Sequence, residues 1–144
     1  MGSTASKKST KKAANKKPAP TQQMKDFVSW FEIPALNIQR AVAFYDHIYR
    51  LKMEISESNG YAMAFFPAKK GIGGAIVAGA GCVPNDHGPL VYLNGGRDLN
   101  DVLGRVDEAG GRVVMPKTLI SKESGYFALF IDSEGNRMAL HSNH

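Results

Sequence analysis

The chain has 144 residues, of which 43% are hydrophobic and 22% are charged, and its formal net charge is +5. These values suit one ordinary folded domain, and no apolar run approaches the roughly 18 residues of a membrane-spanning helix. Cys82 is the only cysteine and no secretory signal opens the chain. An intrachain disulfide is therefore excluded, and we expect a reducing, cytoplasmic location.

Residues 1–24 are expected to form a disordered basic tail ahead of a single domain at 25–144. The first 23 residues hold six of the 18 basic residues and no acidic one, so the remainder carries 12 basic and 13 acidic residues. Small and polar residues there bury too little apolar surface to offset the entropy of ordering. Such a tail can contact nucleic acid or an anionic surface, and its start, MGSTAS, matches a short pattern for N-myristoylation. The alternative is a segment that only aids solubility.

The first half of the domain, about 26–80, is predicted to follow the order strand, helix and three strands. The stretch 27–33 (FVSWFEI) alternates and is rich in aromatic and β-branched residues, as strands are, and Pro34 helps to end it. Asn37 is a good N-cap for the amphipathic helix that follows, whose apolar residues recur at helical spacing. Further strands are expected at 51–57, 61–67 and 73–79.

The second half, about 89–143, is predicted to repeat that order after a loop rich in turn residues. A strand at 89–94 precedes a helix with Asp98 as its expected N-cap and Gly110 or Gly111 past its end. The remaining strands are expected at 112–120 (interrupted at Pro116), 125–132 and 137–142. The fold class is thus α+β, with two tandem βαβββ modules that each place one helix on one face of a sheet. The opposite face must be covered by another module or line a cavity.

Three segments resemble the vicinal oxygen chelate superfamily, the group of glyoxalases, bleomycin-resistance proteins and extradiol dioxygenases. They are EIPALNIQRAVAFYDHIYRLK (32–52), VDEAGGRVVMPKT (106–118) and FIDSEGNRMALHS (130–142). The last is similar to a D-P-x-G-N pattern of the superfamily, with Ser133 in the place of the proline. The resemblance spans roughly Phe27 to Ser142 and implies a cupped mixed sheet around a small-molecule site.

The resemblance also implies where a metal would be held. In metal-dependent members, four inward-facing side chains, usually His and Glu, bind a divalent ion. Matched by their flanking patterns, these positions fall at Trp30, near Gly74, at Leu90 and at Ala139. None of these side chains offers the nitrogen or oxygen that a divalent ion requires. We therefore predict no cofactor, and a metal held instead by Glu32 and His141 is disfavoured because no third ligand is visible.

Strand alternation places polar and aromatic side chains on the same face as those four positions. Predicted ligand-binding residues are Trp30, Tyr92, Asn94 and Arg137. Glu32 and His141 are the candidate general base and acid. The alternative for these two is a satisfied pair at a pocket rim or a subunit interface. Positions facing the other way, such as Ile33 and Leu140, are apolar and are expected to face the helices.

The residues favour a protein of the bleomycin-resistance type, which binds a small molecule without metal and stacks it on Trp30 and Tyr92. One alternative is a glyoxalase-like lyase or isomerase with Glu32 as its base. Another is an interaction protein whose tail binds nucleic acid or membrane. Relatives complete their cavities by pairing modules within or between chains, so we expect a homodimer with two equivalent sites. Glu32 of one chain would then face Tyr92 and His141 of the other.

Overall fold

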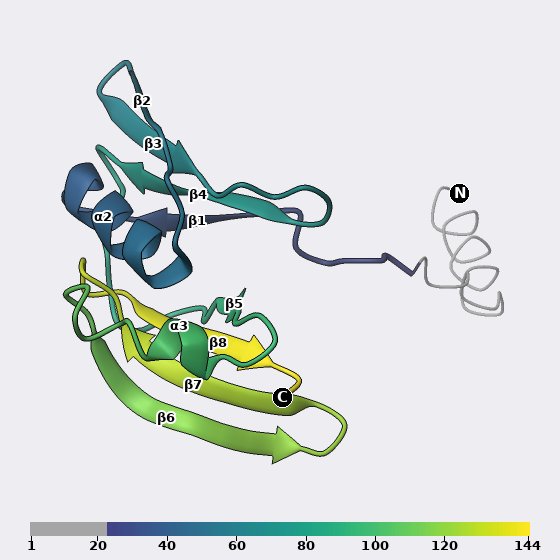
Figure 1. Cartoon of the computed structure of the whole chain (residues 1–144). Helices are drawn as coiled ribbons and strands as arrows, with labels where there is room; N and C mark the ends of the chain where they lie inside the picture. Colours follow the sequence, from purple (N-terminus) through teal and green to yellow (C-terminus); the bar gives the residue numbers. More distant parts are fainter. Residues whose placement is uncertain (1–22) are drawn as a thin grey trace, which may run out of the picture.

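The computed structural model describes residues 23–144, in which two four-stranded mixed sheets lie on either side of the first helix (Figure 1). Expectations for the lysine-rich tail and its MGSTAS start fall outside the described residues. Each sheet belongs to one half of the domain, so the predicted α+β fold of two βαβββ modules is confirmed. No helix in residues 23–144 is long and apolar enough to cross a membrane.

Sheet A is formed by the first module, in the strand order β1-β4-β3-β2. Its elements are β1 (Trp30–Pro34), α2 (Ile38–Tyr49), β2 (Ile55–Ser58), β3 (Tyr61–Phe65) and β4 (Gly73–Ala78). The Asn37 side chain accepts a hydrogen bond from the Arg40 backbone N–H at 3.0 Å, which confirms the predicted N-cap. Because β4 begins at Gly73, which pairs with Trp30, the residues before Trp30 have no partner strand. The strand therefore starts at residue 30 and not at residue 27.

Strand β2 also begins later than predicted, at residue 55 and not at residue 51. Arg50 ends α2 in a left-handed conformation. The next N–H groups turn back to the helix: Leu51 donates to the Asp46 carbonyl at 2.9 Å, and Met53 donates to the Asp46 carboxylate at 2.9 Å. These bonds hold residues 51–53 against the helix end before the chain can enter the sheet.

Sheet B is formed by the second module, in the strand order β5-β8-β7-β6. Its elements are β5 (Tyr92–Asn94), α3 (Asn100–Leu103), β6 (Arg112–Ser121), β7 (Gly125–Ile131) and β8 (Arg137–Ser142). As in sheet A, the first strand of the module pairs in parallel with the last, and the other neighbours are antiparallel. The two modules therefore share one topology although their sequences hardly match.

Three predictions for the second module are wrong in detail. Strand β5 begins at Tyr92, where its pairing with β8 begins, and not at residue 89. The helix covers only four residues. Leu99 stands at its N-cap position, but the capping bond comes from Asp98, whose carboxylate accepts from the Asn100 backbone N–H at 3.0 Å. After Gly104 the backbone bonds tighten to three-residue spacing, as from Arg105 to Val102, and glycine is a poor helix former. Strand β6 is not interrupted at Pro116, because it is an edge strand whose register shifts between residues 115 and 118, where the missing N–H is not needed.

The hydrophobic core lies between the two sheets and is filled from both modules. The Phe44 ring of α2 lies 6.1 Å from Phe130 of β7, and the adjacent Tyr45 ring lies 5.6 Å from Phe66. Ile33 and Leu140, on the inner faces of the sheets, are fully buried. The predicted alternation is therefore confirmed: these apolar positions face α2 and α3. We call the other sides of the sheets the open faces.

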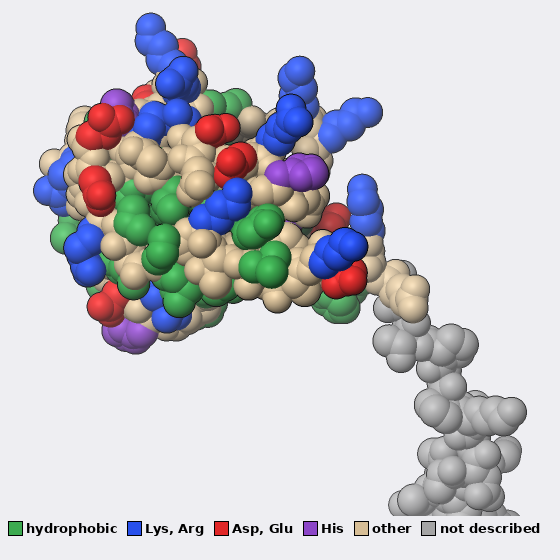
Figure 2. All heavy atoms as spheres, turned by 60° about the horizontal axis from the view of Figure 1, so that its bottom comes forward, with side chains coloured by type: hydrophobic (Ala, Val, Ile, Leu, Met, Phe, Trp, Pro, Cys, Tyr) green, Lys and Arg blue, Asp and Glu red, His purple; other side chains and the backbone are tan. Residues whose placement is uncertain are grey.

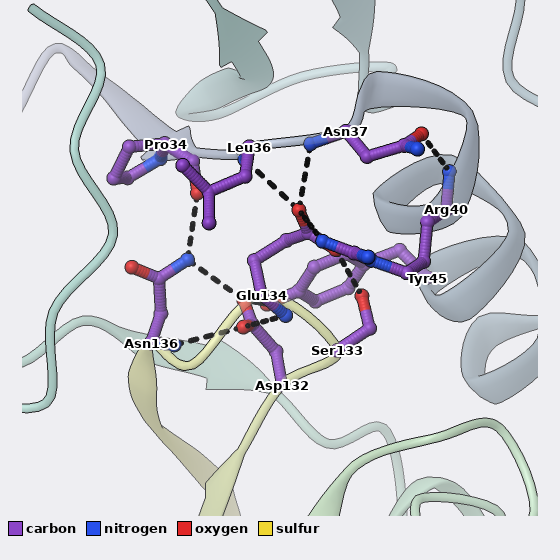
Figure 3. A network of polar contacts seen from close by, with 9 residues as sticks. All are labelled: Pro34, Leu36, Asn37, Arg40, Tyr45, Asp132, Ser133, Glu134 and Asn136. Carbon is purple, nitrogen blue, oxygen red and sulfur yellow. Dashed lines mark hydrogen bonds and ion pairs between the residues drawn. The ribbon is translucent and has the colours of Figure 1, made fainter.

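A polar network ties the modules together at the start of α2 (Figure 3). Glu134, in the turn between β7 and β8, accepts hydrogen bonds from the backbone N–H groups of Leu36 at 2.9 Å and Asn37 at 2.8 Å. Arg40 forms a two-pronged ion pair with the same carboxylate at 2.6 Å and 3.0 Å. The second module thus caps the helix of the first.

Candidate functional site

The predicted site residues lie on the open faces, in two separate groups. Trp30 and Glu32 lie on β1 in sheet A. The others lie on two neighbouring strands of sheet B: Tyr92 and Asn94 on β5, and Arg137 and His141 on β8. No hydrogen bond or aromatic contact in residues 23–144 joins one group to the other. Within one chain the structure therefore gives two half-sites.

The half-site on sheet A is an aromatic surface with a fixed carboxylate. The Trp30 ring packs at 5.9 Å from the Phe65 ring and covers Gly73, where a Cβ atom would lie 3.1 Å from the indole. The Trp30 indole N–H donates to the Glu32 carboxylate at 3.3 Å. The Trp30 side chain nevertheless stays 43% exposed. A flat ligand can therefore reach the indole face while the carboxylate is held beside it.

The half-site on sheet B combines another aromatic pair with an imidazole. The Tyr92 ring lies 6.4 Å from the Phe127 ring. His141 Nε2 lies 2.6 Å from the Ser124 carbonyl oxygen. Because a carbonyl can only accept, Nε2 must carry a proton, and Nδ1 of the neutral ring is an acceptor. Tyr92, Asn94 and His141 line a cavity of about 440 Å³.

Arg137 adds an unsatisfied donor to sheet B. Its Nη2 donates to the Gly88 carbonyl at 3.4 Å, a long contact. Its Nε is buried and has no hydrogen-bond partner among the described residues. Buried donors of this kind are rare, and an oxygen atom of a ligand would satisfy it.

Sequence reasoning missed the aromatic partners Phe65 and Phe127. Each has another aromatic residue as its neighbour in the sequence, Phe66 and Tyr126, so alternation alone does not say which of the two faces outward. The register answers this, because Phe65 pairs with Ala75 opposite Glu32, and Phe127 pairs with His141.

The metal position expected near Gly74 cannot be Gly74 itself. Gly74 pairs with Phe31, and a Cβ atom on Gly74 would lie 2.4 Å from the Phe31 ring, so this position faces the core. The residues of β4 that share the open face are Gly73 and Ala75. Neither has a side chain that can bind a metal.

The other positions also lack ligand atoms. Trp30 and Ala139 lie on the open faces, and Leu90 precedes β5. No group of three or more His, Cys, Asp or Glu side chains in residues 23–144 is placed to hold a metal ion. The side chains present do not fit the four-ligand divalent site that the sequence resemblance implies, and we derive no step through such a metal.

Comparison with known proteins supports the fold. No family model and no curated protein matches the sequence. Among solved structures, a mutant of glyoxalase I from Zea mays superposes with a TM-score of 0.61 at 16% identity, covering 79% of this chain and 46% of that one. A glyoxalase-related enzyme from Fulvimarina pelagi superposes with a TM-score of 0.61 at 14% identity, covering 83% of this chain and 89% of that one. A glyoxalase/bleomycin resistance protein from Albidiferax ferrireducens superposes with a TM-score of 0.58 at 15% identity, covering 81% of this chain and 98% of that one.

These likenesses define a class. The chain has the fold of glyoxalase I and of glyoxalase/bleomycin resistance proteins, as its sequence segments predicted. It spans about half the length of the maize enzyme and nearly all of the two bacterial proteins. At 14–16% identity the likeness shows the fold alone. Function must be argued from the open faces.

Proposed function

We propose that this chain is a small-molecule-binding protein that holds its ligand between aromatic open faces, without the metal site usual for its fold. One observation carries the proposal: each open face bears an aromatic pair, formed by the exposed Trp30 and Phe65 on sheet A and by the exposed Tyr92 with the half-buried Phe127 on sheet B. Aromatic surfaces with a few convergent polar groups suit planar or apolar ligands. The structural neighbour from Albidiferax ferrireducens is a glyoxalase/bleomycin resistance protein, which is compatible with a binding role.

The two half-sites would be joined by a second copy of the chain. Large apolar side chains are exposed on both open faces, including Phe65 at 50% and Tyr92 at 52%. Figure 2 shows hydrophobic side chains gathered on the side of the molecule that carries β6, where Val114, Leu119 and Ile120 are exposed. Exposed apolar groups of this extent favour an interface.

A two-fold homodimer would set sheet A of one copy against sheet B of its partner. Glu32 would then approach Tyr92 and His141 of the other chain, and two equivalent cavities would form. The arrangement explains why each face holds only half of the polar groups that a ligand site needs.

A glyoxalase-like lyase or isomerase is the second candidate. The observation that favours it is the Trp30–Glu32 hydrogen bond, which orients a carboxylate and leaves its other oxygen free to take a proton. Removal of a proton next to a substrate carbonyl would create an enediolate. Its negative charge would have to be stabilised by the unpaired Nε of Arg137, together with Tyr92 and His141. Glu32→Gln would then abolish turnover, whereas in a pure binding protein it would change only affinity.

Trp30 provides the direct test, because it is the only tryptophan in the chain. Its fluorescence should be quenched or shifted when planar aromatic ligands from a metabolite and drug panel are added. Tyr92→Ala should weaken that response about tenfold, since stacked aromatic contacts contribute roughly 0.5–1.5 kcal/mol beyond their buried area. Tyr61→Ala, on sheet A but outside both aromatic pairs, is the control. Ligands that are shown by calorimetry to bind, but that leave Trp30 fluorescence unchanged, would contradict the proposal.

A further inference from the structure

A second cavity lies between the two modules. It is lined mainly from the helix side of the sheets, and at β5 it reaches Tyr92 and Asn94, which also line the cavity on the open face of sheet B. Its volume is about 720 Å³, within the roughly 300–1,000 Å³ range of small-molecule sites. Inner-face residues form much of its wall, with the end of α2 closing one side. Among its lining residues are Phe31, Tyr49, Leu51, Phe66, Ile72 and Val91.

The walls of this cavity are held by specific contacts. The Tyr49 hydroxyl donates to the Asn94 carbonyl at 2.7 Å, which fixes the last turn of α2 against β5. The Phe31 and Phe66 rings pack at 5.6 Å, and Phe31 occupies the space that a side chain on Gly74 would fill. The cavity is therefore built into the packing between the modules.

The apolar side chains of the wall are incompletely buried. Phe31, Leu51, Phe66 and Val91 pack against the core yet stay partly exposed, and Ile72 is 38% exposed. A ligand that covers them would remove apolar area from water, at roughly 25 cal/mol per Å². The wall thus favours a ligand with an apolar body.

The charge at the cavity selects the head group of that ligand. Among the residues that the structure describes, Lys70 is the only charged side chain that lines it, and no Asp or Glu does. No carboxylate in residues 23–144 lies within ion-pair distance of the Lys70 ammonium. An anionic group at Lys70 would be paired without displacing an existing partner.

We propose that the cavity between the modules binds a monocarboxylate with an apolar body, such as a medium-chain fatty acid. The carboxylate pairs with Lys70, and the apolar body lies along Phe31, Leu51 and Phe66. Tyr92 and Asn94 line both this cavity and the proposed ligand site on sheet B, whereas Trp30 and Glu32 of sheet A do not line it.

Calorimetry on the full chain with three ten-carbon probes tests the proposal: decanoate, decanol and decylamine, each below its micelle concentration. Decanoate should bind about five- to tenfold more tightly than decanol, and decylamine more weakly still. Lys70→Gln should weaken decanoate to the affinity of decanol. Lys69→Gln is the matched control, because this neighbouring lysine does not line the cavity.

A blocking variant makes the test independent of charge. Ala68 lines the cavity and is exposed, so Ala68→Trp should fill the space and abolish binding of all three probes while leaving the fold intact by circular dichroism. Equal decanoate affinity in Lys70→Gln and Lys69→Gln, or undiminished binding in Ala68→Trp, would overturn the proposal. Trp30→Phe should leave decanoate affinity unchanged, so failure at this cavity and failure at the open faces are told apart.

Discussion

The contact between Glu134 and the start of α2 gives a prediction whose size follows from the structure. The Glu134 side chain is fully buried, and its two oxygens serve different partners. Oε1 accepts from the backbone N–H groups of Leu36 and Asn37 and from Arg40 Nη2. Oε2 accepts from Arg40 Nε and from the Ser133 hydroxyl. Replacing Glu134 by Gln or by Ala therefore removes different parts of the network.

Glu134→Gln keeps an oxygen for the two backbone N–H groups but removes the charge and the acceptor at Oε2. A hydrogen bond to a charged group contributes roughly 1.5–3 kcal/mol to the free energy of unfolding. Because water can solvate the half-exposed arginine, we expect Glu134→Gln to lower the free energy of unfolding by an amount near the lower limit, about 1.5 kcal/mol. Glu134→Ala removes every bond. Because Leu36 and Asn37 lie at the surface, water replaces part of the lost hydrogen bonding. We expect this variant to lose about 3 kcal/mol of the free energy of unfolding.

The pH dependence supplies an independent check. Burial alone would raise the pKa of Glu134, but hydrogen bonds from Arg40, the Asn37 backbone and Ser133 outweigh it, so the pKa lies below its ordinary value. The folded state then binds fewer protons than the unfolded one. The stabilisation is complete above the unfolded pKa of roughly 4.3 and is lost as pH falls through the lowered folded pKa.

Urea unfolding at pH 7 and at pH 3 measures both effects. The free energies of unfolding of wild type and Glu134→Gln should differ by about 1.5 kcal/mol at pH 7, and this difference should be smaller at pH 3. Glu123→Gln, at an exposed position in the turn after β6, should stay within about 0.5 kcal/mol of wild type. The reasoning is refuted if the gap is the same at both pH values, or if Glu134→Gln is as stable as wild type at pH 7.

Three further predictions concern the core and the open faces. Tyr45→Phe removes a buried 2.8 Å hydrogen bond to Asp132 and should cost about 2 kcal/mol in urea unfolding, and an unchanged midpoint would contradict this. Gly74→Ala forces a Cβ atom to within 2.4 Å of the Phe31 ring and should cost about 2 kcal/mol. Adding Phe31→Leu should recover part of that loss, and purely additive losses would show that the clash is not the cause. Acrylamide quenching of Trp30, 43% exposed in the single chain, should fall as protein concentration rises through dimerisation. Quenching that is independent of concentration would argue against pairing of the open faces.

The sequence by itself determined the order of elements and the two sides of each sheet. Side chains alternate along a strand, so an apolar Ile33 beside a polar Glu32 defines an inner and an outer face before any partner strand is known. The Asn37 cap and the helical spacing after it are local in the same way. Trp30 and Tyr92 could also be assigned to the open faces from the sequence, whereas Phe65 and Phe127 could not, because each has an aromatic neighbour and alternation alone does not choose between the two.

Only the tertiary structure decided which residues meet. The start of β1 depends on where β4 begins, and the orientation of Gly74 depends on its pairing with Phe31. Glu134 caps a backbone N–H group that is 98 positions away in the chain, at Leu36, and no local pattern carries that contact. The cavity beside Lys70 likewise exists only because α2, β1 and β5 from different modules converge. Pairing and packing join residues that are distant in the sequence, whereas periodicity and capping act over a few neighbouring positions.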